Sequence, residues 1–180
     1  MTRSSAPRAA GVIVQMLNSP LGNLVAAADT TGVCALLFAD RRPLSGLMSQ
    51  LKRWFGADVS SGDTRHLRRL RRELAEYFAG SRRRFTVPVS CRGTSFQQAV
   101  WGALREIPYG ATASYADVAQ RVGRPRAQRA VGLANHANRI AILIPCHRVV
   151  RQRGGLGGYA GGSWRKQFLL NLEQGLLRGS

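Results

Sequence analysis

The hydrophobic pattern of the first ninety residues predicts a small sheet beside one amphipathic helix. Three apolar or β-branched runs separated by turn residues are typical of an antiparallel meander: 12–17, 23–28 and 32–39. Apolar residues then recur at helical spacing over 65–79, with arginines on the opposite face, which predicts a helix that ends at Gly80. A last apolar run at 85–89 predicts an edge strand.

Stronger helix signals follow over residues 94–136. A capping box at 94–97 starts one helix, and a second cap at 114–117 starts a short one. A Gly-Arg-Pro turn then leads into a further helix over 126–136. Two short helices joined by a glycine-containing turn predict a helix-turn-helix. An aliphatic run at 140–144 predicts a buried strand.

The second helix of this pair is expected to have one packing face and one outward face. We expect Ala127, Ala130, Leu133 and Ala134 to pack on the protein, and Arg129, Gly132 and His136 to face outward. A glycine inside a helix costs about 1 kcal/mol relative to alanine. Its use here would be a close approach by another surface, such as a nucleic-acid groove, and a neutral surface glycine is the alternative.

The composition fits a folded chain. Of 180 residues, 44% are hydrophobic and 20% are charged, which excludes disorder. The longest good apolar run, 140–145, is far shorter than the roughly 18 residues of a membrane span, and no signal-peptide core follows residues 1–10. We therefore expect an α/β (α+β) protein with a small sheet-and-helix domain at 1–90 and a mainly helical domain at 91–180.

The number of cysteines indicates the redox compartment, and the net charge indicates the class of binding partner. Three cysteines without a close pair exclude a disulfide scaffold and favour a reduced, cytoplasmic setting. The net charge of +18 predicts a polyanionic partner, most simply nucleic acid, with an affinity that falls steeply with salt. The positive charge divides equally between the two halves, so charge alone does not locate that partner. The arginine face of 65–79 is either a solvated helix face or a DNA contact.

One cysteine differs from the others in its neighbours. Cys146 follows the predicted strand and lies between Pro145 and His147, whereas Cys34 and Cys91 have apolar or loop neighbours and are interpreted as structural. A cysteine nucleophile needs a base to take its proton, so Cys146 and His147 are a candidate pair, with a structural Cys-His dipeptide as the alternative. No CxxC pair is present, so neither a zinc site nor another metal or cofactor is expected.

Sequence blocks in the second half resemble the catalytic domain of the O6-alkylguanine-DNA alkyltransferases, which repair DNA by direct reversal. The blocks occur in this order: Gly93-Thr94-Ser95-Phe96-Gln97, Val100-Trp101, Ile107-Pro108-Tyr109-Gly110, Ser114-Tyr115, Arg129-Ala130-Val131-Gly132, Asn138, Pro145-Cys146-His147-Arg148-Val149 and Gly158-Tyr159. So many blocks in order exclude accidental agreement. The first ninety residues resemble the family's N-terminal domain only in layout.

The resemblance implies a methyltransferase that moves an alkyl group from guanine O6 to its own cysteine, once, after the nucleotide has been flipped through the minor groove. The catalytic residues that it implies are Cys146, His147, Glu173 and Asn138. The DNA contacts that it implies are Tyr115, Arg129, Gly132, Asn135, Thr94 and Ser114, and the base pocket comprises Tyr115, Val149, Tyr159 and Ala160. The expected partner is double-stranded DNA carrying O6-alkylguanine. We expect a monomer that can cluster on DNA and has no membrane contact.

Two residues depart from the family's pattern, and three other functions are alternatives. Ala160 stands where many relatives have Ser, and Arg139 stands where Pro is frequent. The rivals are a non-catalytic lesion-binding relative, a helix-turn-helix regulator and a thiol hydrolase. Cys146 argues against the first, the lack of a dimerisation segment against the second, and the lack of an oxyanion-hole motif against the third.

Overall fold

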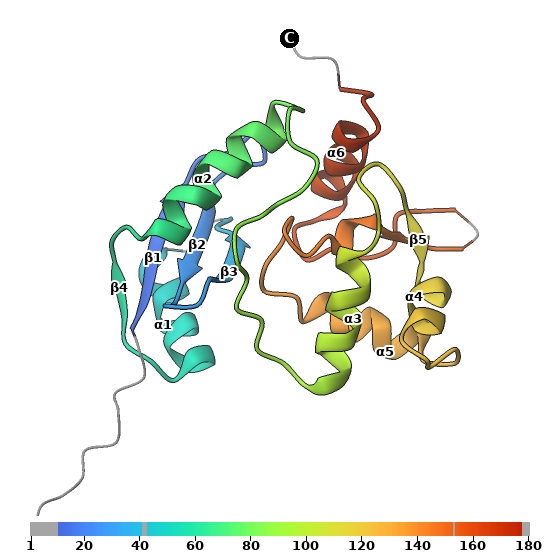
Figure 1. Cartoon of the computed structure of the whole chain (residues 1–180), viewed down its shortest axis with the longest axis horizontal. Helices are drawn as coiled ribbons and strands as arrows, with labels where there is room; N and C mark the ends of the chain where they lie inside the picture. Colours follow the sequence, from blue (N-terminus) through green and yellow to red (C-terminus); the bar gives the residue numbers. More distant parts are fainter. Residues whose placement is uncertain (1–10, 41–42, 153, 178–180) are drawn as a thin grey trace, which may run out of the picture.

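The first half of the chain is a four-stranded sheet with a helix on each face (Figure 1). The computed structural model describes residues 11–40, 43–152 and 154–177. The first elements are β1 (Val12–Leu17), β2 (Leu24–Ala28), β3 (Val33–Phe38), α1 (Leu44–Phe55), β4 (Val59–Ser61) and α2 (Arg65–Phe78). The strand order is β3-β2-β1-β4. Strand β2 is antiparallel to both β1 and β3, and β4 is parallel to β1.

Strand β2 is buried along its whole length because each face of the sheet is covered. Val25 shares a hydrophobic cluster with Leu51 of α1, whereas Ala26 shares a cluster with Leu70 of α2. This alternation follows from the two-residue period of a strand. A strand buried on both faces reads as continuously apolar, which is what the sequence of β2 shows.

The predicted meander and the helix at 65–79 are confirmed, while the hydrophobic pattern does not predict α1 or β4. The predicted edge strand at 85–89 is wrong. Only Val89 pairs, in a single parallel bridge with Val33. The backbone N–H groups of Thr86 and Val87 instead donate to the buried carboxylate of Glu73, at 2.8 and 3.1 Å. A side chain therefore replaces the sheet partner that this segment was expected to have.

The second half is mainly helical, as expected. Its elements are α3 (Ser95–Arg105), β5 (Ala113–Ser114), α4 (Tyr115–Arg121), α5 (Gln128–His136), the 3₁₀ helix η1 (Cys146–Arg148), β6 (Val149–Val150) and α6 (Ser163–Glu173). Both predicted capping boxes are present, at the starts of α3 and α4. Helices α4 and α5 form the predicted pair, with Gly123 in the left-handed region (φ 68°) in the turn between them.

The predicted strand at 140–144 is wrong. Ile140 makes one parallel bridge with Leu36 of β3, and residues 141–144 then turn, with Ile142 at φ 70°. The Leu36 N–H donates to the Arg139 carbonyl (2.8 Å), and the Ala141 N–H donates to the Leu36 carbonyl (3.0 Å). The segment that leads into η1 is therefore tied to the edge of the first-half sheet.

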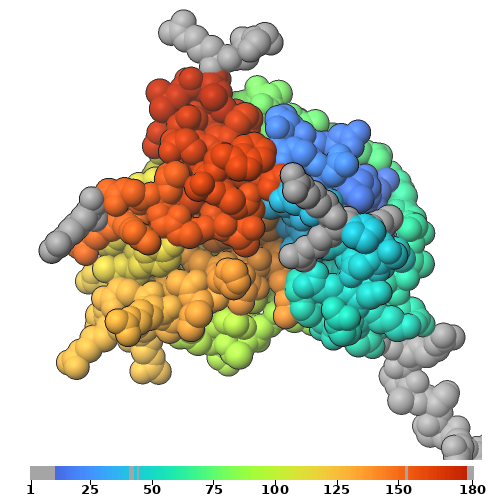
Figure 2. Space-filling view, turned by 180° about the vertical axis from the view of Figure 1, so that it is seen from behind, coloured from blue at the N-terminus to red at the C-terminus, as the bar shows by residue number. Residues whose placement is uncertain are grey.

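One hydrophobic cluster continues from the α2 side of the sheet into the second half. It includes Tyr77 of α2, Leu104 of α3, Val131 of α5 and Leu169 of α6. Figure 2 shows the later part of the chain packed directly against the first half. The division at 90/91 stays a prediction, and the prediction about residues 1–10 lies outside the described residues. Among the described helices, none has the length and apolar character to cross a bilayer.

Candidate active site

Cys146 opens η1, directly after the turn at 141–144, and is buried. The side chain of Asn138 holds this turn together. Its Nδ2 donates to the Ile144 carbonyl (2.9 Å) and to Cys146 Sγ (3.2 Å), and its Oδ1 accepts from the Ile140 N–H (2.9 Å). Asn138 thus stabilises the turn and also donates a hydrogen bond to the sulfur.

The carboxylate of Glu173, in the last turn of α6, lies at the centre of a buried network. The His147 ring contacts its Oε1 (2.9 Å), and Arg148 donates to both of its oxygens (2.8 and 3.0 Å). The Tyr77 hydroxyl donates to Oε1 (2.7 Å) and the Gly110 N–H to Oε2 (3.2 Å). Burial alone would raise the pKa of Glu173, but hydrogen bonds from His147 and Arg148 outweigh it and lower the pKa to about 2.

Burial and the contact with Glu173 determine the protonation state of His147. Burial lowers the pKa of its imidazole, against the opposing effect of Glu173, so the ring is neutral at pH 7. A carboxylate can only accept, so the ring proton sits on Nε2 and Nδ1 carries the free lone pair. Nδ1 is buried and has no hydrogen-bond partner among the described residues. Nδ1 of His147 is therefore a basic atom that is available to accept a proton.

The thiol itself is protonated at rest. Burial raises the pKa of Cys146, while the Asn138 hydrogen bond and the positive charge of Lys166 lower it. Lys166 is buried in α6, and its Nζ donates to the Val149 carbonyl (2.5 Å). Burial lowers the pKa of this lysine to about 8, against the attraction of Cys146. Burial therefore opposes formation of the thiolate, whereas Asn138 and Lys166 favour it.

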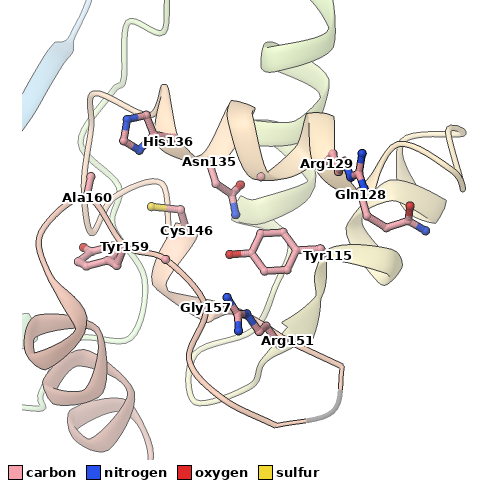
Figure 3. A pocket seen from close by; sticks show the side chains of 12 residues that line it. Tyr115, Gln128, Arg129, Asn135, His136, Cys146, Arg151, Gly157, Tyr159 and Ala160 are labelled. Carbon is pink, nitrogen blue, oxygen red and sulfur yellow. The ribbon is translucent and has the colours of Figure 1, made fainter.

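A pocket of about 580 Å³ opens beside the sulfur (Figure 3). Seven of the predicted site residues line it: Tyr115, Arg129, Gly132, Asn135, Cys146, Tyr159 and Ala160. Helix α5 forms one wall and the segment 157–160 another. Gln128, His136, Arg151, Gly157 and Gly158 complete the lining. Helix α5 and the thiol thus face the same space.

The other predicted residues lie outside this pocket. His147, Glu173 and Asn138 are buried; Asn138 contacts the sulfur, and His147 contacts Glu173. Thr94 and Ser114 cap α3 and α4 by accepting hydrogen bonds from backbone N–H groups. Val149 is fully buried, and its carbonyl accepts from Lys166. Burial and capping therefore account for the side chains of Thr94, Ser114 and Val149.

The expected inward face of α5 is partly wrong. Val131 and Ala134 are buried, whereas Leu133 is 72% exposed. Successive helical residues point about 100° apart, so a helix that buries Val131 and Ala134 turns Leu133 outward. A Cβ added to Gly132 would lie 3.8 Å from the Tyr115 ring, an ordinary contact. Packing inside the protein therefore does not require a glycine there.

The remaining cysteines, Cys34 and Cys91, are thiols with raised pKa values. Cys34 is buried, and burial raises the pKa of its thiol to about 12, so it is inert at neutral pH. Cys91 is half-buried and burial raises its pKa as well. Among the described residues, no group of three or more His, Cys, Asp or Glu side chains could hold a metal ion.

Comparison with known proteins matches both halves of the chain. Residues 12–91 match the ribonuclease-like domain of 6-O-methylguanine DNA methyltransferase, and residues 95–175 match its DNA binding domain. The methylated-DNA–protein-cysteine methyltransferase of Methanosarcina acetivorans is 42% identical over 158 residues, which cover 88% of this chain and 96% of that protein. The chain belongs to the methylated-DNA–protein-cysteine methyltransferase family.

Two further relatives agree. The constitutive methylated-DNA–protein-cysteine methyltransferase of Bacillus subtilis is 51% identical over 113 residues, 62% of this chain and 68% of that protein. A crystal structure of Mycobacterium tuberculosis OGT in complex with DNA is 38% identical and has a TM-score of 0.77 over 92% of this chain and 93% of that one. The resemblance and the fold class predicted from the sequence are confirmed.

Three site residues of this methyltransferase escape sequence reasoning. Lys166, Arg148 and Tyr77 act on Cys146 or Glu173 from positions that no motif argument singled out for a role. A charged residue that is predicted to be buried is the available signal, because it needs a partner. Lys166 gives that signal, since it lies two and three residues before the apolar Phe168 and Leu169, which follow it in α6. Tyr77 reads as an ordinary core aromatic and gives none.

Proposed function

We propose that this methyltransferase takes an alkyl group from guanine O6 in double-stranded DNA onto Cys146 Sγ. The observation that carries the proposal is a buried thiol in the wall of a pocket that helix α5 also lines. Displacement at an alkyl carbon needs a soft nucleophile, and a thiolate is one. The pocket volume of about 580 Å³ lies within the range of small-molecule sites.

The proposed proton path runs from the thiol to His147. Cys146 gives its proton to Nδ1 of His147 through a bridging water, and Glu173 stabilises the imidazolium through Nε2. Sγ then forms a bond to the alkyl carbon while the carbon–O6 bond breaks and its electron pair passes to O6. The proton returns to N1 of the guanine, which leaves an unmodified base and a neutral imidazole.

The product limits each molecule to one reaction. A thioether is a very poor leaving group, and no second thiol lines the pocket to regenerate Cys146. The protein is therefore spent after a single transfer, and repair is stoichiometric. This separates it from a thiol hydrolase, whose thioester intermediate water can cleave.

The lesion must leave the duplex to reach the sulfur. An O6 atom inside stacked DNA cannot approach a buried thiol, so the nucleotide is flipped out. Helix α5 enters the minor groove, where Arg129 occupies the vacated place in the stack and Tyr115 presses on the flanking phosphate. The groove is only about 6 Å wide, and Gly132 lets the helix backbone approach it closely.

Backbone groups hold the flipped base. The base is held through backbone groups of Cys146 and Val149, and the backbone at Tyr159 and Ala160 lies near O6. Ala160 supplies no hydroxyl, so only its backbone N–H donates there. Most of the affinity comes from phosphates, so the protein selects the lesion and has little sequence preference.

The proposal includes the setting of the reaction. The protein acts as a monomer that can cluster on DNA. All three cysteines are free thiols, which fits a reduced, cytoplasmic compartment. A non-catalytic lesion-binding role is less well supported, because such a protein has no use for a thiol with a dedicated base.

Intact-protein mass spectrometry tests the proposal. Wild-type protein mixed with duplex DNA that contains O6-methylguanine should gain the mass of one methyl group, located on Cys146. Cys146→Ser should bind the same DNA and gain nothing, whereas the matched control Cys91→Ser should react like wild type. Methylation of Cys146→Ser would show that the nucleophile is wrongly assigned.

A further inference from the structure

Arg151 is a pocket residue that the proposed function does not use. It directly follows β6, its side chain is exposed, and it lines the same pocket as Cys146. Figure 3 shows Arg151 on one side of Tyr115 and helix α5 on the other. The pocket therefore has one arginine on α5, which is Arg129, and a second arginine on the far side of Tyr115 from that helix.

The pairing of β5 with β6 places Arg151 beside Tyr115. The two strands are parallel, and Ser114 lies opposite Val150. The residues that follow these two, Tyr115 and Arg151, therefore leave the strands side by side. The Arg151 N–H also donates to the Gly155 carbonyl (3.1 Å), which holds the backbone at this point. The position of Arg151 next to Tyr115 is thus set by backbone hydrogen bonds.

The charge of Arg151 reaches Tyr115 and has no carboxylate to neutralise it. Burial raises the pKa of the Tyr115 hydroxyl, and the positive charge of Arg151 acts against that rise. Within the described part of the chain, Arg151 forms no ion pair, and none of the described pocket residues is Asp or Glu. The cation that acts on Cys146 is Lys166. Arg151 is therefore a second, unneutralised cation in this site.

The expected occupant of the pocket has only one kind of charged group. A guanine base and its alkyl substituent are neutral, whereas each phosphate of the DNA backbone carries a negative charge. A guanidinium presents its N–H donors in a fixed fork that matches the oxygens of a phosphate. Base and phosphate are joined through one sugar, so a base that enters the pocket brings a flanking phosphate to its mouth. Charge and geometry therefore both favour a phosphate as the partner of Arg151.

We propose that Arg151 binds the flanking phosphate on which Tyr115 presses, and so holds the backbone of the flipped nucleotide at the mouth of the pocket. This inference rests on the proposed function. Arg129 fills the place that the nucleotide has left, and Arg151 holds the nucleotide in its new position. Arg151 is thus a DNA-binding residue that takes no part in the chemistry of the sulfur.

The test removes one charge from the protein and one from the DNA. Single-turnover methyl transfer is measured with excess protein on duplexes that contain O6-methylguanine, with natural phosphates or with one neutral methylphosphonate at the linkage 5′ or 3′ to the lesion. Arg151→Gln should slow transfer from the natural duplex about tenfold, because a charge-assisted hydrogen bond is lost. In wild type, a methylphosphonate at one of the two linkages should cause a similar loss. In Arg151→Gln, that methylphosphonate should slow transfer by less than about twofold more.

Three comparisons show whether the effect belongs to a phosphate contact. Arg71→Gln removes an equal charge from an exposed position on α2 and should keep the full wild-type loss at the methylphosphonate. Arg151→Lys keeps the charge and should recover most of the rate. With free O6-methylguanine base, which has no phosphate, Arg151→Gln should react within about twofold of wild type. On the natural duplex, the dependence of its log rate on log salt should be shallower by about 0.9.

Several outcomes would overturn the phosphate contact. One is an unchanged duplex rate in Arg151→Gln, and another is a wild-type rate that neither methylphosphonate lowers. A slowed Arg151→Gln that still shows the full methylphosphonate loss would also overturn it, because Arg151 would then act through the position of Tyr115. Absence of methyl transfer from the natural duplex by wild-type protein would instead refute the proposed function.

Discussion

The hydroxyl of Tyr77, in α2 of the first half, donates a 2.7 Å hydrogen bond to the same Glu173 oxygen that contacts the ring of His147. The first half therefore contributes directly to the hydrogen-bond network around Glu173 and His147. One carboxylate oxygen links a residue of the N-terminal helix to the base that would activate Cys146. The position of that base depends on contacts from both halves of the chain.

Removing this hydroxyl should weaken both stability and chemistry. We expect Tyr77→Phe to lower the free energy of unfolding by about 1.5–3 kcal/mol, because a hydrogen bond to a buried charged group is lost. Single-turnover methyl transfer should slow several-fold as the Glu173–His147 pair loosens. Tyr109→Phe is the matched control, since the Tyr109 hydroxyl makes only a 3.4 Å contact with the Leu172 carbonyl. Equal effects of the two changes would contradict a specific role for Tyr77.

Stability should fall as the solution is acidified, and Glu173 should account for part of the loss. Its pKa is about 2 in the folded protein against an ordinary 4.5, so the unfolded chain binds a proton that the folded one does not. The stabilisation is complete above pH 4.5 and disappears as pH falls toward 2, a loss of about 3 kcal/mol. Urea denaturation across this range should show it. The same curve for Glu173→Gln should be flatter between these values.

Burial of neutral His147 adds a second loss at higher pH. Its folded pKa lies below the ordinary 6.5, so the unfolded chain takes up a proton first as pH falls through 6.5. Replacing His147 by Gln should therefore remove the pH dependence of the unfolding free energy just below pH 6.5. Persistence of that dependence in the variant would assign it to another group.

Lys166 should set the reactivity of the thiol without touching DNA. Replacing it by Met removes a buried positive charge near Cys146, so the thiol pKa should rise and its alkylation by iodoacetamide at pH 7 should slow about tenfold per unit of that rise. Lys166→Arg keeps the charge and should lose less. In wild type, the benefit should fade above pH 8, where the lysine itself loses its proton. A variant with unaltered thiol reactivity would exclude this role.

Arg129 should matter for flipping and not for chemistry. It is exposed on α5 and lines the pocket. Arg129→Ala should slow methyl transfer from duplex DNA by about 10- to 100-fold, since extrusion of a paired nucleotide costs a few kcal/mol. Its reaction with free O6-methylguanine base should match wild type within twofold. Equal slowing on both substrates would place Arg129 in the chemistry of the thiol.

Local signals in the sequence predict much of the second half. The caps at Thr94 and Ser114 begin helices where expected, because capping is a contact between residues three apart. The run at 140–144 predicts a strand that does not form, because five aliphatic residues have the same pattern in a strand and in a buried turn. Only the contact with Leu36 of β3 decides between them, and that partner lies a hundred residues earlier.

Long-range contacts also explain why parts of the site were missed. The motif Pro145–Val149 predicts the nucleophile and the base, whereas Lys166 and Tyr77 join the site through tertiary contacts with Val149 and Glu173. The helical projection predicts Leu133 on the packing face, yet α5 is rotated so that Val131 and Ala134 are buried. Pattern alone assigns residues to a helix but leaves its rotation open.

The hydrogen bonds between Leu36 and the segment 139–141 make the reactive loop an extension of the first-half sheet. A gene fragment encoding only the second half would carry every sequence block of the catalytic domain and still produce a loop whose anchoring strand is missing. We therefore expect the two halves to evolve together. Substitutions at the edge of β3 should be accompanied by substitutions around the thiol.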